Sequence, residues 1–221
     1  MTYTMDIAGL KRDLPLCPVS DDLYIGAFVM FGDVEMTIHA AKELLKRAPE
    51  FDYIIAPEAK AIPLAYEMSR QCGIPYLLAR KKAKAYMTGI FEVHVHSITT
   101  AGTQTLVIDT ADAERMKGKR ILIVDDVIST GESLRAMEEL VKKAGGNIVG
   151  KMAVLAEGGA IERHDITVLA PLPLFNPDGT LKNGEKQKRE LLKQLPFPSK
   201  ENPSVSFADS SPVRGARLVF R

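Results

Sequence analysis

Two adjacent carboxylates, Asp125 and Asp126, follow a run of apolar residues and stand just before a loop of hydroxyl residues and glycine. The run, 121–124, is typical of a buried strand, and the loop, 129–133, leads into apolar residues at helical spacing. In such a loop glycine lets the backbone approach an anion, which the amides at the helix start attract. The acids would repel a bare phosphate, but they suit sugar hydroxyls with a divalent metal near the phosphates.

A cationic run at 80–84, Arg-Lys-Lys-Ala-Lys, follows a second apolar segment at 74–79. Taken alone, such a run is typical of a solvated surface. Its place directly after a buried strand, in a chain that also carries the acidic pair and its loop, favours an anion site instead. A Walker-type nucleotide loop is excluded, because Gly-Lys-Ser/Thr is absent and acids stand where that loop would begin.

Hydrophobic periodicity predicts the elements that must position these residues. One helix is expected from Asp33, a possible N-cap, to about Lys46, and another is expected to end near Cys72 and close at Gly73. Strands are expected at 51–56, 74–79, 105–108, 121–124, 147–155 and 166–169, whereas residues 1–27 look irregular. Alternating strands and helices predict an α/β fold: a parallel sheet with helices on both faces and ligands at its carboxyl edge.

Composition sets outer limits on function. The 221 residues suit one domain with additions, and 46% hydrophobic content is enough for a sizeable core. A net charge of +1 predicts no broad attraction to nucleic acid or to an anionic membrane. The two cysteines form no metal or redox motif, no signal peptide is visible, and no apolar run has membrane-spanning length. A cytoplasmic location is expected.

The segment 121–133 resembles the phosphoribosyl-pyrophosphate (PRPP) signature of type I phosphoribosyltransferases. The resemblance implies that Asp125 and Asp126 hold the ribose hydroxyls and are the catalytic residues. It also implies that the 5-phosphate is bound by the loop residues Ser129, Thr130, Gly131, Glu132 and Ser133. Mg²⁺ would accompany PRPP, and no protein side chain is assigned as its ligand.

Residues 25–175 further resemble the adenine phosphoribosyltransferases within that family. The resemblance implies that pyrophosphate is held by Glu58, Ala59, Lys60, Arg80, Lys81, Lys82 and Lys84. It implies that the segment 29–33 is a hood strand over the base, with Met30 and Phe31 as base-binding residues and Phe31 stacked on the ring. The segment 85–103 would close over the site to exclude water.

Some positions depart from the adenine-specific pattern. Lys60 and Gly32 stand where that family usually carries arginine, and the segment 97–103 lacks the glutamate of its Leu-Glu-Tyr-Gly motif. That segment is closer in style to bacterial xanthine phosphoribosyltransferases. Adenine is therefore favoured while xanthine, hypoxanthine and orotate stay open, and the catalytic base is unassigned, with Thr99, Thr100 or water as options. A PRPP-sensing regulator is a further alternative.

The resemblance implies a type I phosphoribosyltransferase-like fold with a small hood and a C-terminal extension. We expect an N-terminal segment with the hood at 1–33, the core at 34–175 and a partly irregular extension at 176–221. The partners would be PRPP and a purine base, with neither nucleic acid nor membrane, and the chain would form a homodimer. His94 and His96 share one strand face, which is more typical of a half-exposed strand than of a metal site.

Overall fold

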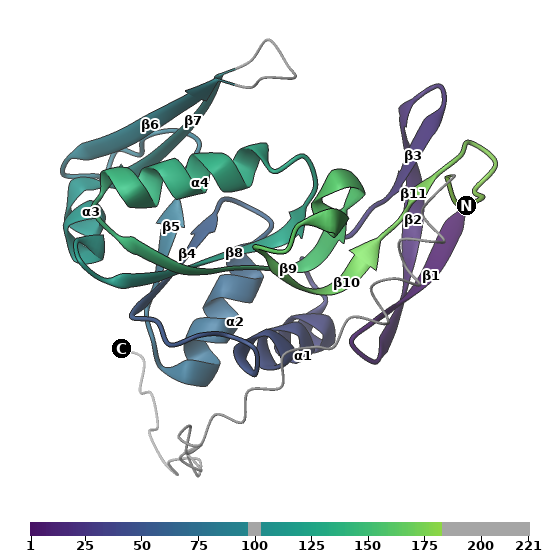
Figure 1. The fold of residues 1–221 in the computed structure, drawn as a ribbon, viewed down its shortest axis with the longest axis horizontal. Coiled ribbons are helices and arrows are strands. Elements are labelled where there is room, and N and C mark those ends of the chain that lie inside the picture. Colours follow the sequence, from purple (N-terminus) through teal and green to yellow (C-terminus); the bar gives the residue numbers. More distant parts are fainter. Residues whose placement is uncertain (97–102, 183–221) are drawn as a thin grey trace, which may run out of the picture.

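A computed structural model of the chain describes residues 1–96 and 103–182 (Figure 1). Its centre is a five-stranded parallel sheet of order β10-β9-β8-β4-β5. The strands are β4 (Tyr53–Pro57), β5 (Tyr76–Ala79), β8 (Arg120–Ile128), β9 (Asn147–Glu157) and β10 (Thr167–Leu172). The strand order changes direction between β4 and β8, and ligands of such sheets bind beyond the carboxyl ends at that point. The predicted parallel sheet is confirmed.

Helices cover both faces of this sheet (Figure 1). The helices α1 (Val34–Leu45) and α2 (Ile62–Cys72) lie on one face, and α4 (Glu132–Lys143) lies on the other. The Asp33 side chain accepts a 3.0 Å hydrogen bond from the Met36 amide, so the predicted N-cap of α1 is confirmed. The predicted end of α2 is also confirmed, since Gly73 adopts φ of 73°, a left-handed conformation that favours glycine.

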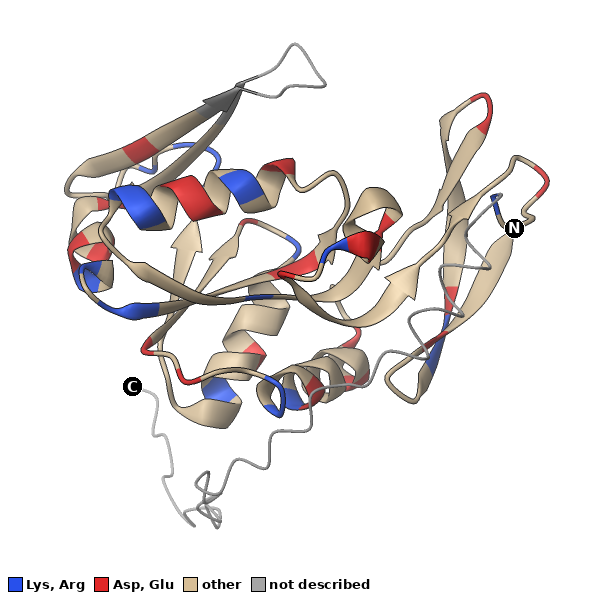
Figure 2. Cartoon of the chain, viewed as in Figure 1, with Lys and Arg blue, Asp and Glu red and all other residues tan. Residues whose placement is uncertain are grey.

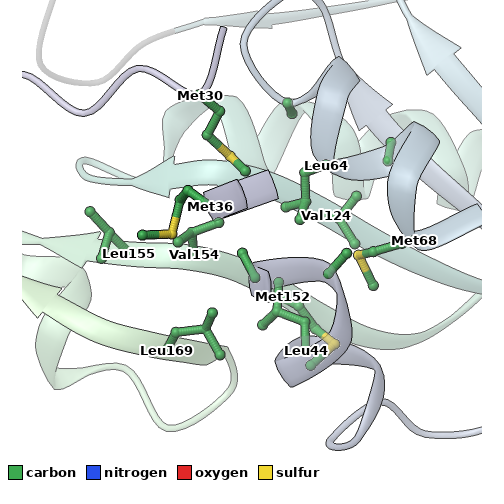
Figure 3. Packing of buried hydrophobic residues seen from close by; sticks show 14 of the residues in the cluster. Met30, Met36, Leu44, Leu64, Met68, Val124, Met152, Val154, Leu155 and Leu169 are labelled. Carbon is green, nitrogen blue, oxygen red and sulfur yellow. The ribbon is translucent and has the colours of Figure 1, made fainter. Parts of the chain in front are cut away.

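Each face of the sheet has its own hydrophobic core. Figure 3 shows the core on the side of α1 and α2, where residues of the two helices pack on β8, β9 and β10; its labelled members include Met36, Leu44, Leu64, Met68, Val124, Met152 and Leu169. The core on the other face contains Met137 and Leu140 of α4. Burial on both faces is why the central strands read as continuous apolar runs.

The N-terminal residues form a second, antiparallel sheet of order β1-β2-β3-β11, so the expectation of an irregular segment at 1–27 was wrong. Its strands are β1 (Thr2–Ile7), β2 (Leu10–Ser20), β3 (Leu23–Gly26) and β11 (Leu174–Phe175). Met5 and Ile7 alternate with exposed residues and enter the core. The expected hood strand at 29–33 is absent from this described part of the chain, because a turn at Gly32, with φ of 80°, leads directly into α1.

A hairpin of β6 (Ile90–His96) and β7 (Thr103–Asp109) lies beside α4. The expected strand at 105–108 therefore exists but pairs in this hairpin rather than in the parallel sheet. The short helix α3 (Thr110–Met116) follows and was not expected; the Asp109 side chain caps it by accepting a 3.1 Å hydrogen bond from the Ala111 amide.

Residues 183–221, most of the expected C-terminal extension, lie outside the described residues, as does the segment 97–102 with Thr99 and Thr100. Among the helices that the structure describes, none is long and apolar enough to cross a membrane.

Candidate active site

The acidic pair lies near the carboxyl end of β8, beside the point where the strand order changes direction. Asp125 is 8% exposed and Asp126 is 4% exposed. The Asp126 amide donates a 2.9 Å hydrogen bond to Oδ1 of Asp125. Burial, reinforced by the charge of Asp126, raises the pKa of Asp125 well above its usual value. A cation or a hydroxyl group that binds to this pair would stabilise the ionised form of the two carboxylates.

Lys60 brings one cation to the pair. It lies in the turn between β4 and α2, and its Nζ is 3.0 Å from Oδ2 of Asp126. That oxygen is buried and accepts no hydrogen bond from any residue that the structure describes. The ion pair therefore offsets the charge of Asp126 and leaves an acceptor available to a hydroxyl group or a metal ion.

Glu58 joins the two loops that were expected to hold pyrophosphate. Its Oε1 accepts a 2.8 Å hydrogen bond from the Lys81 amide, and its Oε2 lies 3.3 Å from Nη1 of Arg80. The Glu58–Ala59 peptide bond is cis. Because its carboxylate is occupied in this way, Glu58 fixes the second loop relative to the first.

The cationic run after β5 divides into two parts. Arg80 is anchored, since its backbone pairs with Val107 of β7 and its guanidinium carbon lies 5.6 Å from the centre of the Tyr86 ring. All three lysines of the run are exposed, but Lys81 lines the cavity next to the acids and Lys82 and Lys84 do not. The structure thus brings Lys81 to the acidic pair but leaves the last two lysines at the surface.

The loop 129–133 ends at the start of α4 with the features that an anion site requires. Gly131 is the N-cap, with φ of 79°, and offers no side-chain oxygen to the first amides of the helix. The Thr130 hydroxyl accepts a long, 3.4 Å hydrogen bond from the Glu132 amide. The helix N-terminus is therefore open toward a negatively charged group.

A single cavity of about 680 Å³ connects these parts. It is lined by Pro57, Glu58, Ala59, Lys60, Lys81, Thr105, Leu106, Asp125, Asp126, Val127 and Ser133. Residues from the acidic pair, from the turn after β4, from the run at 80–84 and from the loop 129–133 therefore face one space. Thr105 and Leu106 come from β7 and were not expected; only their position on the hairpin beside β5 places them here.

The residues expected to bind the base lie elsewhere. Met30 is 1% exposed and belongs to the hydrophobic core, and Phe31 is 53% exposed. Neither lines the cavity that holds the acids. Met30 instead borders a second cavity of about 320 Å³ over α1 and α2. Their roles toward the base stay predictions.

His94 pairs with neighbouring side chains of the hairpin. Its Nδ1 lies 3.0 Å from the Thr105 hydroxyl and its Nε2 lies 3.3 Å from Glu92. No group of three potential metal-binding side chains occurs within residues 1–96 and 103–182. The side chain of His96 is not described.

A family model for the phosphoribosyl transferase domain matches residues 35–170. This match covers more than half of the chain and includes the acidic pair, the turn after β4, the run at 80–84 and the loop 129–133. The chain therefore belongs to the phosphoribosyl transferase domain family.

Individual relatives and solved structures agree with this membership. An adenine phosphoribosyltransferase from Thermosipho africanus is 30% identical over 164 residues, which are 73% of this chain and 93% of that protein. A hypoxanthine/guanine phosphoribosyltransferase from Methanothermococcus okinawensis is 32% identical over 133 residues, covering 58% of this chain and 69% of that protein. The crystal structure of an adenine phosphoribosyltransferase from Thermoanaerobacter pseudethanolicus superposes with a TM-score of 0.60 at 20% identity, covering 72% and 95% of the two chains. That structure supports the type I fold.

Proposed function

We propose that this protein transfers the phosphoribosyl group of PRPP to a free purine, adenine by preference, and releases pyrophosphate. The observation that carries the proposal is the cavity at the sheet edge, where Asp125 and Asp126 meet Lys60, Lys81 and Ser133. Acceptors for ribose hydroxyls thus lie between a cationic side and a helix N-terminus. PRPP has the same order of groups: pyrophosphate, ribose and 5-phosphate.

The chemistry breaks the bond between ribose C1 and the pyrophosphate oxygen and forms a bond from C1 to a ring nitrogen of the base, which loses its proton. Positive charge develops on the ribose ring in the transition state, and the carboxylates of Asp125 and Asp126 stabilise it. Negative charge develops on the departing pyrophosphate, where Lys60 and Lys81 offset it. The amides of the phosphate loop hold the 5-phosphate and so fix the position of C1.

Magnesium bound with PRPP fits this site. Oδ2 of Asp126 is a buried carboxylate oxygen that accepts no hydrogen bond from the described residues and lies 3.0 Å from the Lys60 ammonium group, and hard oxygen ligands of this kind suit Mg²⁺. When bound, the ion would neutralise part of the pyrophosphate charge. Asp125 and Asp126 are the residues that would lie nearest to it.

A turnover assay tests the proposal. The protein is given PRPP and Mg²⁺ with adenine, hypoxanthine, guanine, xanthine or orotate, and pyrophosphate release is measured. Turnover of orotate alone would point to a pyrimidine enzyme. Binding of PRPP without turnover of any base would favour a PRPP-sensing regulator, against which the net charge of +1 already argues.

We expect Lys81→Ala to raise the KM for PRPP about tenfold and to change the KM for the base much less. Lys81 lines the cavity, so its charge acts on pyrophosphate directly, whereas Lys82 does not line it and Lys82→Ala should act in the same direction but less strongly. Steady-state kinetics with each substrate varied in turn measures the difference. Lys119→Ala, at the opposite end of β8, is the matched control. Unchanged PRPP kinetics in both loop variants would assign the run to the solvated surface.

We also propose that the chain forms a homodimer in the cytoplasm. Val34, Ile38 and Tyr66 are 66%, 43% and 57% exposed, and together they line the cavity of about 320 Å³ over α1 and α2. Exposed apolar side chains that cluster in this way are typical of protein–protein contacts. Light scattering should give twice the 24.2 kDa of the chain, and a mass of one chain at micromolar concentration would refute the dimer.

A further inference from the structure

Four charged side chains form a cluster behind the phosphate loop: Glu138 of α4, Lys151 of β9, and Arg163 and Asp165 before β10. Lys151 Nζ donates a 2.9 Å hydrogen bond to Glu138 and another to Asp165. Arg163 donates two hydrogen bonds to Asp165, from Nε to Oδ1 at 2.9 Å and from Nη2 to Oδ2 at 2.7 Å. None of the four lines the cavity. Figure 2 shows acidic and basic residues alternating along α4.

These two hydrogen bonds direct the other side of the Arg163 guanidinium group toward the phosphate loop, residues 129–133. Since Nε and Nη2 are engaged with Asp165, Nη1 is the nitrogen on the far side of the guanidinium group. A Cβ atom added to Gly131 would lie only 3.0 Å from that Nη1. The guanidinium group therefore packs against Gly131 where this residue lacks a side chain, at the N-cap of the helix expected to receive the 5-phosphate.

The cluster also keeps Arg163 in place and charged. Its two parallel hydrogen bonds to Asp165 raise the pKa of Arg163 above its usual value. Asp165 is held in turn by Lys151, and Lys151 by Glu138, near the middle of α4. Residues before β10, in β9 and in α4 thus together hold Arg163 next to the loop. The Arg163 and Asp165 side chains are 31% and 50% exposed, so these hydrogen bonds orient the guanidinium group and reduce the freedom that it loses when an anion binds.

We propose that Arg163 is a positioning residue of the 5-phosphate subsite: it supports the loop at Gly131 in its anion-binding conformation and directs the Nη1 side of its guanidinium group at that loop. The proposal rests on the proposed function, since it takes the 5-phosphate of PRPP as the ligand. Asp165 supports Arg163, and Lys151 and Glu138 support Asp165.

The test compares ligands that do and do not carry the 5-phosphate. Binding of ribose 5-phosphate, PRPP and inorganic pyrophosphate to the full-length protein is measured by calorimetry with Mg²⁺ present. For Arg163→Met we expect the Kd of ribose 5-phosphate and of PRPP to rise about tenfold or more. The Kd of pyrophosphate should stay within about twofold, because that ligand occupies the Lys60 and Lys81 side of the cavity.

Asp165→Asn is the second variant, because it keeps the guanidinium group but weakens the hold on it. It should raise the Kd of ribose 5-phosphate and of PRPP, but by less than Arg163→Met does. It carries the test if Arg163→Met does not fold. Arg115→Met, which removes an exposed arginine of α3 paired with Asp112, is the matched control and should change no Kd. An equal rise in the Kd of all three ligands, or no rise for any of them, would overturn the proposal. An unaltered protein that binds neither ribose 5-phosphate nor PRPP would instead refute the proposed function.

Discussion

Replacing both Asp125 and Asp126 with asparagine should lower kcat/KM for PRPP by about a thousandfold or more. The substitution keeps the size of both side chains but removes two negative charges from beside the ribose, where positive charge develops in the transition state. Asparagine also replaces one acceptor oxygen of each side chain with a donor group, which opposes the ribose hydroxyls. Steady-state kinetics with adenine at saturation measures the loss.

The unliganded double variant should be at least as resistant to heat as the unaltered protein. Burial and Asp126 raise the pKa of Asp125, so the folded state disfavours its ionised form more than the unfolded state does. This destabilisation of the folded state is absent at low pH and is greatest above the raised pKa. A neutral asparagine therefore removes it at pH 7. A folded variant with near-normal turnover would refute the ribose assignment. A variant that had lost its cooperative unfolding would point to a structural role for the acids.

The parts of the fold that the sequence predicted depend on local signals. Asp33 caps the helix that it precedes, and Gly73 ends a helix because it tolerates a left-handed conformation. The strands of the parallel sheet are buried on both faces, so their apolar runs are continuous. The carboxyl ends of parallel strands share one edge, and this alone placed Lys60 and the run at 80–84 on the side of the acids.

The parts that were missed depend on pairing between distant residues. The strand β7 carries the same kind of apolar pattern as β8, but it pairs with β6 and with Arg80, and nothing in its own residues shows that partner. The alternation of Tyr3, Met5 and Ile7 with polar residues is itself a strand signal, so β1 could have been predicted from the sequence even though its partner could not. The pairing of β11 with β3 joins residues about 150 positions apart.

The sequence predicted which kinds of residue meet in the site more completely than it predicted how they are arranged. The acids, Lys60, Lys81 and Ser133 share one cavity, as their positions after strands implied. The sequence could not show that Lys81 lines the cavity while Lys82 does not, because this depends on the path of the chain after the Arg80 bridge to Val107. It could not show Arg163 beside Gly131 either, since the fold alone brings these two segments together.

We predict that adenine is the preferred base, with a kcat/KM at least about thirtyfold above those for hypoxanthine and xanthine. Adenine presents an amine donor and a ring-nitrogen acceptor where 6-oxopurines present an acceptor and a donor. A pocket lined by backbone groups matches one of these patterns and leaves two buried groups unpaired with the other, at roughly 1–3 kcal/mol each.

Competition between bases measures this preference directly, because the ratio of kcat/KM values sets the ratio of products when two bases share one reaction. Adenine and hypoxanthine at equal concentration, with limiting PRPP, should give almost only the adenine product. Phe31→Ala should raise the KM for adenine and leave that for PRPP unchanged, since the exposed Phe31 ring is expected to stack on the base and not on the phosphates. A larger kcat/KM for hypoxanthine or xanthine would refute the preference for adenine. The phosphoribosyl chemistry would stand in that case, because it depends on Asp125 and Asp126 and not on the base pocket.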